Sequence, residues 1–154
     1  MADETPPDTH TTRRQMEYLL ELRAYVHEEA GWIRTLTDTI QRGVAGEETA
    51  TQVGQIVVDV SAPYRAEIAR VRGLTAPQGC EAVADTLRTE TARAEEYLSA
   101  LARWVAAGQV GISLLRDNAG EEVHGVLQAF VASRETFERA YLEAARLVET
   151  TETV

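Results

Sequence analysis

The chain has 154 residues, 44% of them hydrophobic, which is enough for one domain with a substantial apolar core. Its 25 acidic residues outnumber its 15 basic residues, all of which are arginine, and the net charge of −10 argues against a nucleic-acid partner. No apolar run approaches the roughly 20 residues of a membrane-spanning helix, so no membrane span is predicted.

Residues 1–11 are expected to form a disordered tail, because Pro6, Pro7 and their acidic and polar neighbours give them little to bury. This beginning also lacks the basic and apolar regions of a signal peptide. A cytoplasmic location is therefore predicted. The alternative is an extracytoplasmic location, if a leader has been removed.

The segment from Arg13 to Arg42 has the pattern of a long amphipathic helix. Thr11 or Thr12 can cap its beginning, and the arginine followed by Gly43 signals its end. Its apolar positions recur at intervals of three and four: Leu19, Leu22, Val26, Ala30, Ile33, Leu36 and Ile40.

The next apolar stripe, from Val53 to Val71, predicts a second helix that ends before Gly73. Residues 53–60 are rich in β-branched side chains and partly alternate, so a strand is the alternative interpretation there. The helical stripe continues through the following residues, which favours the helix. Pro63 is expected to kink it.

Residues 80–107 and 110–149 carry two further helical stripes. Gly108 is expected to end the first of them, and Asp117-Asn118-Ala119-Gly120 to break or kink the second. Residues 150–154 are expected to fray. Four helices joined by short turns predict an all-α, antiparallel, up-down-up-down four-helix bundle over residues 12–149.

A few polar residues interrupt the apolar stripes or flank them. If the turns begin at the glycines, antiparallel packing places Glu29, Asp59, Glu90 and the pair Glu121 and His124 at one level in the middle of the bundle. The expected result is a polar layer that crosses the core.

The sequence Glu121-Glu122-Val123-His124 resembles the Glu-x-x-His motif of ferritin-like proteins. That resemblance implies a carboxylate and histidine site for a transition metal (iron, zinc or manganese), formed here by Glu29, Asp59, Glu121 and His124. A second Glu-x-x-His is absent from the chain, so the implied site is smaller than a di-iron centre. The competing interpretation is a solvated helix face, or a histidine held in the core by polar partners.

Trp32 and Trp104 both lie off the narrow apolar faces of their helices. They form either the edges of a wide core or an interface with a protein partner or a second copy. No serine lies in a nucleophile-elbow sequence and no glycine loop can hold phosphate, so no catalytic residue is predicted. The leading interpretation is a non-enzymatic bundle that binds a partner or self-associates, and the alternative is a ferritin-like metal-binding or redox bundle.

One longer stretch carries a second resemblance. Ile68-Ala-Arg-Val71-Arg-Gly-Leu74-Thr-Ala-Pro77, with the long helix that follows to Gly108-Gln109, resembles a helix–turn–helix of uncharacterised bacterial four-helix-bundle domains. Many members of that group are extracytoplasmic. The resemblance covers about half of the chain and implies the same bundle fold, with no settled activity.

Overall fold

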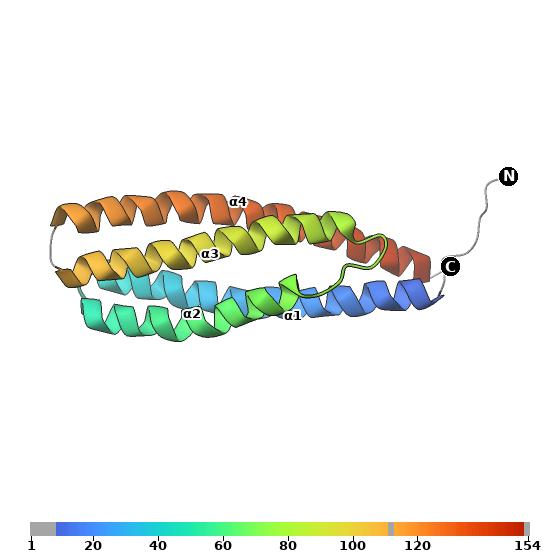
Figure 1. Ribbon diagram of the computed structural model, residues 1–154, viewed down its shortest axis with the longest axis horizontal. Helices are drawn as coiled ribbons and strands as arrows, with labels where there is room; N and C mark the ends of the chain where they lie inside the picture. The colour runs from blue at the N-terminus through green and yellow to red at the C-terminus, as the bar shows by residue number, and fades with distance from the viewer. Residues whose placement is uncertain (1–8, 111–112, 153–154) are drawn as a thin grey trace.

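A computed structural model describes residues 9–110 and 113–152, and these residues form an elongated four-helix bundle (Figure 1). Consecutive helices run in opposite directions, which confirms the predicted fold class. No described residue belongs to a strand, so the helical interpretation of residues 53–60 is correct. The helices are α1 (Thr9–Val44), α2 (Ala50–Arg72), α3 (Glu81–Val110) and α4 (Ser113–Glu152).

Each helix packs against its neighbours in the sequence, and α4 returns to close the bundle against α1. The contact between α3 and α4 is the most extensive of the four. The α1–α2 turn lies at the same end of the bundle as the last turn of α3 and the beginning of α4 (Figure 1). We call this end the turn end. The beginning of α1 and the last turn of α4 lie at the opposite end.

The bundle forms because each helix buries one apolar stripe. The largest fully buried apolar side chains are Leu22, Leu36, Ile68, Leu98, Leu101, Phe130 and Phe137, and Tyr25, Tyr64 and Tyr97 are buried with them. The Tyr97 and Phe130 rings stack with 5.7 Å between their centroids and join α3 to α4. In the described part of the chain, no helix combines the length and hydropathy needed to cross a membrane.

A capping box fixes the beginning of α2. The Thr49 side chain accepts a hydrogen bond from the Gln52 backbone N–H, and the Gln52 side chain accepts one from the Thr49 backbone N–H. Just before this cap, Gly46 adopts a φ of 77°, a left-handed conformation that glycine enters without steric cost. Pro63 lies inside α2 without ending it.

The helices extend beyond several of the stops that the sequence indicated. Helix α1 continues past Gly43 and α3 past Gly108, and the predicted break at residues 117–120 is wrong because α4 runs through them. A glycine within a helix costs only about 1 kcal/mol, and packing against neighbouring helices offsets that cost. Residues 9–11 and 150–152, expected in the tails, are helical, while residues 1–8 and 153–154 lie outside the described part.

Candidate functional sites

Two glutamates meet in the core of the bundle. Glu29 of α1 is 1% exposed and Glu90 of α3 is fully buried. The Glu29 Oε2 atom accepts hydrogen bonds from the hydroxyls of Tyr25 at 2.6 Å and Tyr64 at 2.5 Å, and its Oε1 atom accepts one from Arg134 Nε at 3.0 Å. Three donors converge on one carboxylate, which is the arrangement that holds a buried negative charge.

The hydrogen-bond geometry also identifies which of the two glutamates carries a proton. The Tyr25 hydroxyl oxygen lies 2.6 Å from Glu29 Oε2 and 2.9 Å from Glu90 Oε2, but a phenol has only one proton to donate. When Tyr25 donates to Glu29, a proton on Glu90 is needed to make the second contact favourable. Burial, together with the neighbouring Glu29, raises the pKa of Glu90 to about 10. Glu90 is therefore a neutral carboxylic acid at pH 7.

The two tyrosines of this cluster are hydrogen-bond donors and not reactive phenolates. Burial and the nearby Glu29 carboxylate raise the pKa of Tyr25 and of Tyr64 well above the usual value. Glu90 Oε1 is buried and forms no hydrogen bond with any described residue. We call Tyr25, Glu29, Tyr64, Glu90 and Arg134 the core polar cluster. It balances one negative charge with one guanidinium.

The structure separates the four residues of the predicted metal site. Glu29 lies in the core polar cluster, whereas Asp59 is exposed and accepts a hydrogen bond from Gln55. Glu121 is exposed on α4, and so is His124, whose ring nitrogen lies 3.2 Å from the Gln128 amide nitrogen. Among residues 9–110 and 113–152, no group of three or more His, Cys, Asp or Glu side chains is placed to hold a metal ion.

The predicted polar layer exists, but with different partners. Glu29 and Glu90 both belong to it, while Tyr64 occupies the place expected for Asp59 and Arg134 the place expected for Glu121 and His124. The cause is the register, because α1 and α3 each continue past the glycine expected to end them. Because α2 begins only at Ala50 and α4 only at Ser113, the turns lie later in the chain, and the facing residues of α2 and α4 move by more than one turn.

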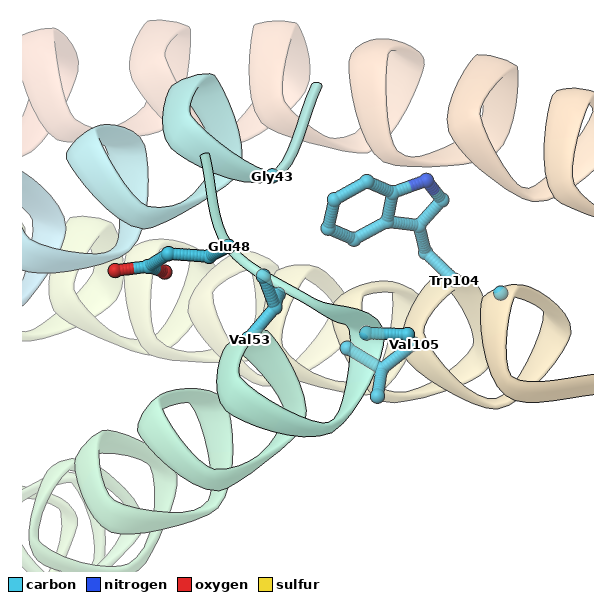
Figure 2. Close-up of a pocket in the computed structure, with 7 residues that line it drawn as sticks. Gly43, Glu48, Val53, Trp104 and Val105 are labelled. Carbon is cyan, nitrogen blue, oxygen red and sulfur yellow. The ribbon is translucent and has the colours of Figure 1, made fainter. Parts of the chain in front are cut away.

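A second feature lies at the turn end, where Trp104 of α3 separates two hollows. The first, of about 160 Å³, is lined by apolar side chains and glycines together with Glu48, whose buried Oε2 atom has no hydrogen-bond partner among the described residues, and we call it the apolar hollow (Figure 2). The second is wider, at about 800 Å³, and we call it the acidic hollow. The apolar hollow is lined by Gly43, Glu48, Ala50, Val53, Trp104, Val105 and Gly108, and the acidic hollow by Gly43, Val44, Trp104, Asp117, Gly120, Glu121 and His124.

Glycines on two other helices make room for the indole ring of Trp104. A Cβ atom on Gly43 would lie 3.0 Å from Val53 Cγ2 and 3.6 Å from Trp104 Cη2, and one on Gly120 would lie 3.8 Å from Trp104 Nε1. In Figure 2 the six-membered ring points towards Gly43 and Val53, and the Glu48 carboxylate points away from the indole. The Trp104 indole N–H donates no hydrogen bond to any described residue.

The other tryptophan lies in a different environment. Trp32 stacks on Tyr64 with 5.0 Å between the ring centroids and packs at the edge of the core. It therefore supports the core polar cluster from the side. Of the two tryptophans that the sequence marked as candidates for an interface, only Trp104 lines a hollow among those described here.

Three acidic side chains at the turn end lack an ion-pair partner among the described side chains. Asp117 and Glu121 are exposed at the acidic hollow, Glu47 is exposed in the α1–α2 turn, and none of the three forms an ion pair with a described residue. Among the described arginine side chains nearby, Arg42 contacts Asp38 and Glu48, and Arg103 contacts Glu122. The apolar hollow is thus bordered by acidic surface.

Comparisons with protein-family models, with curated proteins and with solved structures find no match to this chain.

Proposed function

We propose that this chain is a non-catalytic helical bundle that binds another protein through its turn end. The observation that carries the proposal is the apolar hollow beside Trp104, where a large aromatic ring borders unfilled apolar space. Protein interfaces concentrate their binding energy in a few anchor side chains that enter such pockets, and tryptophan is enriched among the residues that form them.

The dimensions of the apolar hollow fit one side chain of a partner. Its volume of about 160 Å³ resembles the roughly 150 Å³ of an apolar cavity that binds benzene. Ordinary small-molecule sites are larger, at about 300–1,000 Å³. Val44 and Val110, which are 76% and 63% exposed, add apolar surface at the same end of the bundle. These features favour an anchor residue with apolar contacts around it.

A second copy of the chain is a less suitable occupant than a different protein. The chain carries a net charge of −10, and the carboxylates at the turn end lack counter-charges among the described side chains. Two such surfaces repel each other. Light scattering on the purified protein is therefore expected to show a monomer. A stable dimer would show that the partner is a second copy of the chain and not a different protein.

A peptide selection tests the proposal directly. Random 12-residue peptides displayed on phage are selected for binding to the folded protein, and the binders are mapped by NMR through the two indole N–H signals. We expect the Trp104 signal to shift and the Trp32 signal to stay, because Trp32 packs against Tyr64 in the core. A failure to enrich peptides, or enrichment of peptides that leave Trp104 unchanged, would contradict the proposal.

Gly108 provides a matched pair of variants for this test. It lines the apolar hollow, and a Cβ atom at this position would meet only Ala50 Cβ, at 3.9 Å. Gly108→Leu fills the hollow without removing any side chain and should abolish peptide binding. Gly108→Ala leaves most of the space and should preserve it. Gly125→Leu is the control, since nothing lies within 4 Å of a Cβ atom at that site on α4.

Metal binding by a ferritin-like bundle is the second candidate function. In its favour, α1 and α3 bring Glu29 and Glu90 together, as two helices of a di-metal bundle each supply one glutamate. The other two helices supply Tyr64 and Arg134 here. Elemental analysis of untagged protein tests this candidate. A stoichiometric transition metal would support it, and absence of metal with no shift in Tm on adding iron, zinc or manganese would refute it.

A further inference from the structure

We infer that the segment bound at the turn end is basic, with one large apolar side chain close to arginine or lysine residues. This inference rests on the proposed function and specifies the chemistry of its partner. It combines the apolar hollow with the acidic hollow, which share Gly43 and Trp104 as a common wall.

Trp104 presents a different group to each hollow. Its six-membered ring lies beside Gly43 and Val53 at the apolar hollow, and its Nε1 atom lies near Gly120, which lines the acidic hollow. The indole N–H has no acceptor among the described residues, so a carbonyl oxygen of a bound segment can accept its hydrogen bond. One side of the indole thus suits an apolar side chain, and the other suits a polar chain that passes over α4.

The charges determine which polar chain fits. Asp117 and Glu121 border the acidic hollow without an ion pair to any described side chain. An acidic segment would be repelled by these carboxylates. A neutral segment would displace the water that solvates them and would offer no positive charge in its place. Arginine or lysine beside the anchor supplies the missing charge, and a cation near the indole face gains a further cation–π attraction.

The first residues of the chain itself do not meet this requirement. Residues 1–8 contain Asp3, Glu4 and Asp8 and no basic residue, so they carry the same sign of charge as the acidic hollow. Helix α1, which follows them, begins at the end of the bundle opposite the turn end. The chemistry of the turn end therefore fits a segment of another protein.

The composition of the selected peptides is the first readout. We expect the enriched 12-residue peptides to carry an aromatic residue or leucine within three positions of arginine or lysine, with a net positive charge. Affinity should decrease several-fold as salt is raised from roughly 50 to 500 mM, because exposed charges are screened. Enrichment of neutral or acidic peptides whose binding Gly108→Leu abolishes would overturn this inference and leave the proposed function in place.

A pair of charge variants gives the second readout. Asp117→Asn combined with Glu121→Gln is expected to weaken the binding of a selected basic peptide by about tenfold, or about 1.4 kcal/mol, because both carboxylates that face the cationic residues are neutralised. Glu135→Gln, an exposed carboxylate elsewhere on α4, is the control and should leave the affinity unchanged. Equal affinity of the wild type, the double variant and Glu135→Gln for the basic peptide would overturn the assignment of a cationic partner.

Two further outcomes separate this inference from its alternatives. If phenethylamine alone bound as tightly as the selected peptides, the turn end would be a site for a small organic amine, and the assignment to a protein segment would be wrong. If no peptide bound at Trp104 at all, the proposed function would fail and this inference with it.

Discussion

Glu29 and Glu90 are both buried glutamates, but the hydrogen bonds around them assign a negative charge to Glu29 and a proton to Glu90. Glutamine substitutions at the two positions should therefore have different effects on stability. Glu90→Gln replaces a neutral acid with a neutral amide of the same shape, which does not have to hold a proton at pH 7, so the free energy of unfolding at pH 7 should rise, by up to about 3 kcal/mol. Glu29→Gln removes the carboxylate that three donors share. It leaves the Arg134 guanidinium without its main counter-charge.

The magnitude for Glu29→Gln follows from the surroundings of Arg134. Removing one partner of a buried ion pair typically costs about 3–5 kcal/mol. The Arg134 side chain retains 22% exposure and also contacts Glu138 at 3.5 Å, so part of its charge stays solvated and paired. We therefore expect a loss near the lower end, about 3 kcal/mol, which is opposite in sign to the effect of Glu90→Gln at pH 7.

The pH dependence provides an independent test of the proton on Glu90. Its pKa is about 10 in the folded protein, against 4.5 for an ordinary glutamate, so between these values the folded state holds a proton that the unfolded state releases. This contribution to stability is complete below the ordinary pKa and is lost as pH rises towards about 10. Its limiting slope is tenfold in the unfolding equilibrium per pH unit, or about 1.4 kcal/mol.

Urea denaturation followed by circular dichroism, at several pH values between 6 and 9, measures both effects on the wild type and the two variants. The wild type should lose stability with rising pH, and Glu90→Gln should show a flatter dependence because the titrating group is gone. Other titrating residues are shared by the two proteins and cancel. Equal destabilisation by the two substitutions at pH 7, or identical pH slopes for wild type and Glu90→Gln, would refute the reasoning.

Four other substitutions test the hydrogen bonds, the apolar hollow and the helix cap with the same denaturation assay. The buried Tyr97 hydroxyl has no hydrogen-bond partner among the described residues, so Tyr97→Phe should be neutral or stabilise by about 1 kcal/mol, whereas Tyr64→Phe loses a hydrogen bond to a charged group and should cost about 1.5–3 kcal/mol. Equal losses for the two would contradict the hydrogen-bond assignment. Gly108→Ala should stabilise α3 by up to about 1 kcal/mol, and a loss of stability would show that the apolar hollow is filled. Thr49→Ala removes the capping box of α2 and should cost about 1 kcal/mol, with Thr51→Ala as a control outside the cap.

The apolar stripes were sufficient to predict the fold, because helical periodicity is a local property of the sequence. They also marked Glu29 as a polar residue on a core-facing position. The register between helices was not predictable to the same accuracy. Gly43 and Gly108 look like stop signals, yet each lies within its helix, since packing against another helix outweighs the small cost of an interior glycine. A shift of more than one turn was enough to replace the predicted metal ligands with Tyr64 and Arg134.

The residues missed by the sequence analysis left a weaker signal. Tyr25 and Tyr64 have polar ends that need partners when buried, and buried tyrosines near a glutamate on the core face could have suggested the cluster. Nothing local distinguishes Trp32 from Trp104. One packs on a tyrosine from α2, and the other borders space created by Gly43 of α1 and Gly120 of α4. Such differences depend on residues distant in the sequence.

The position of Trp104 relative to the outer ends of α1 and α4 has a practical consequence. Both of these ends lie at the side of the bundle opposite the turn end, and α1 alone has 36 residues, or about 54 Å at 1.5 Å per residue. A dye or a surface linker attached at the first turn of α1 or the last turn of α4 therefore lies about 50 Å from the hollows. When the molecule is immobilised through these ends, its turn end faces the solution and is accessible to a binding partner.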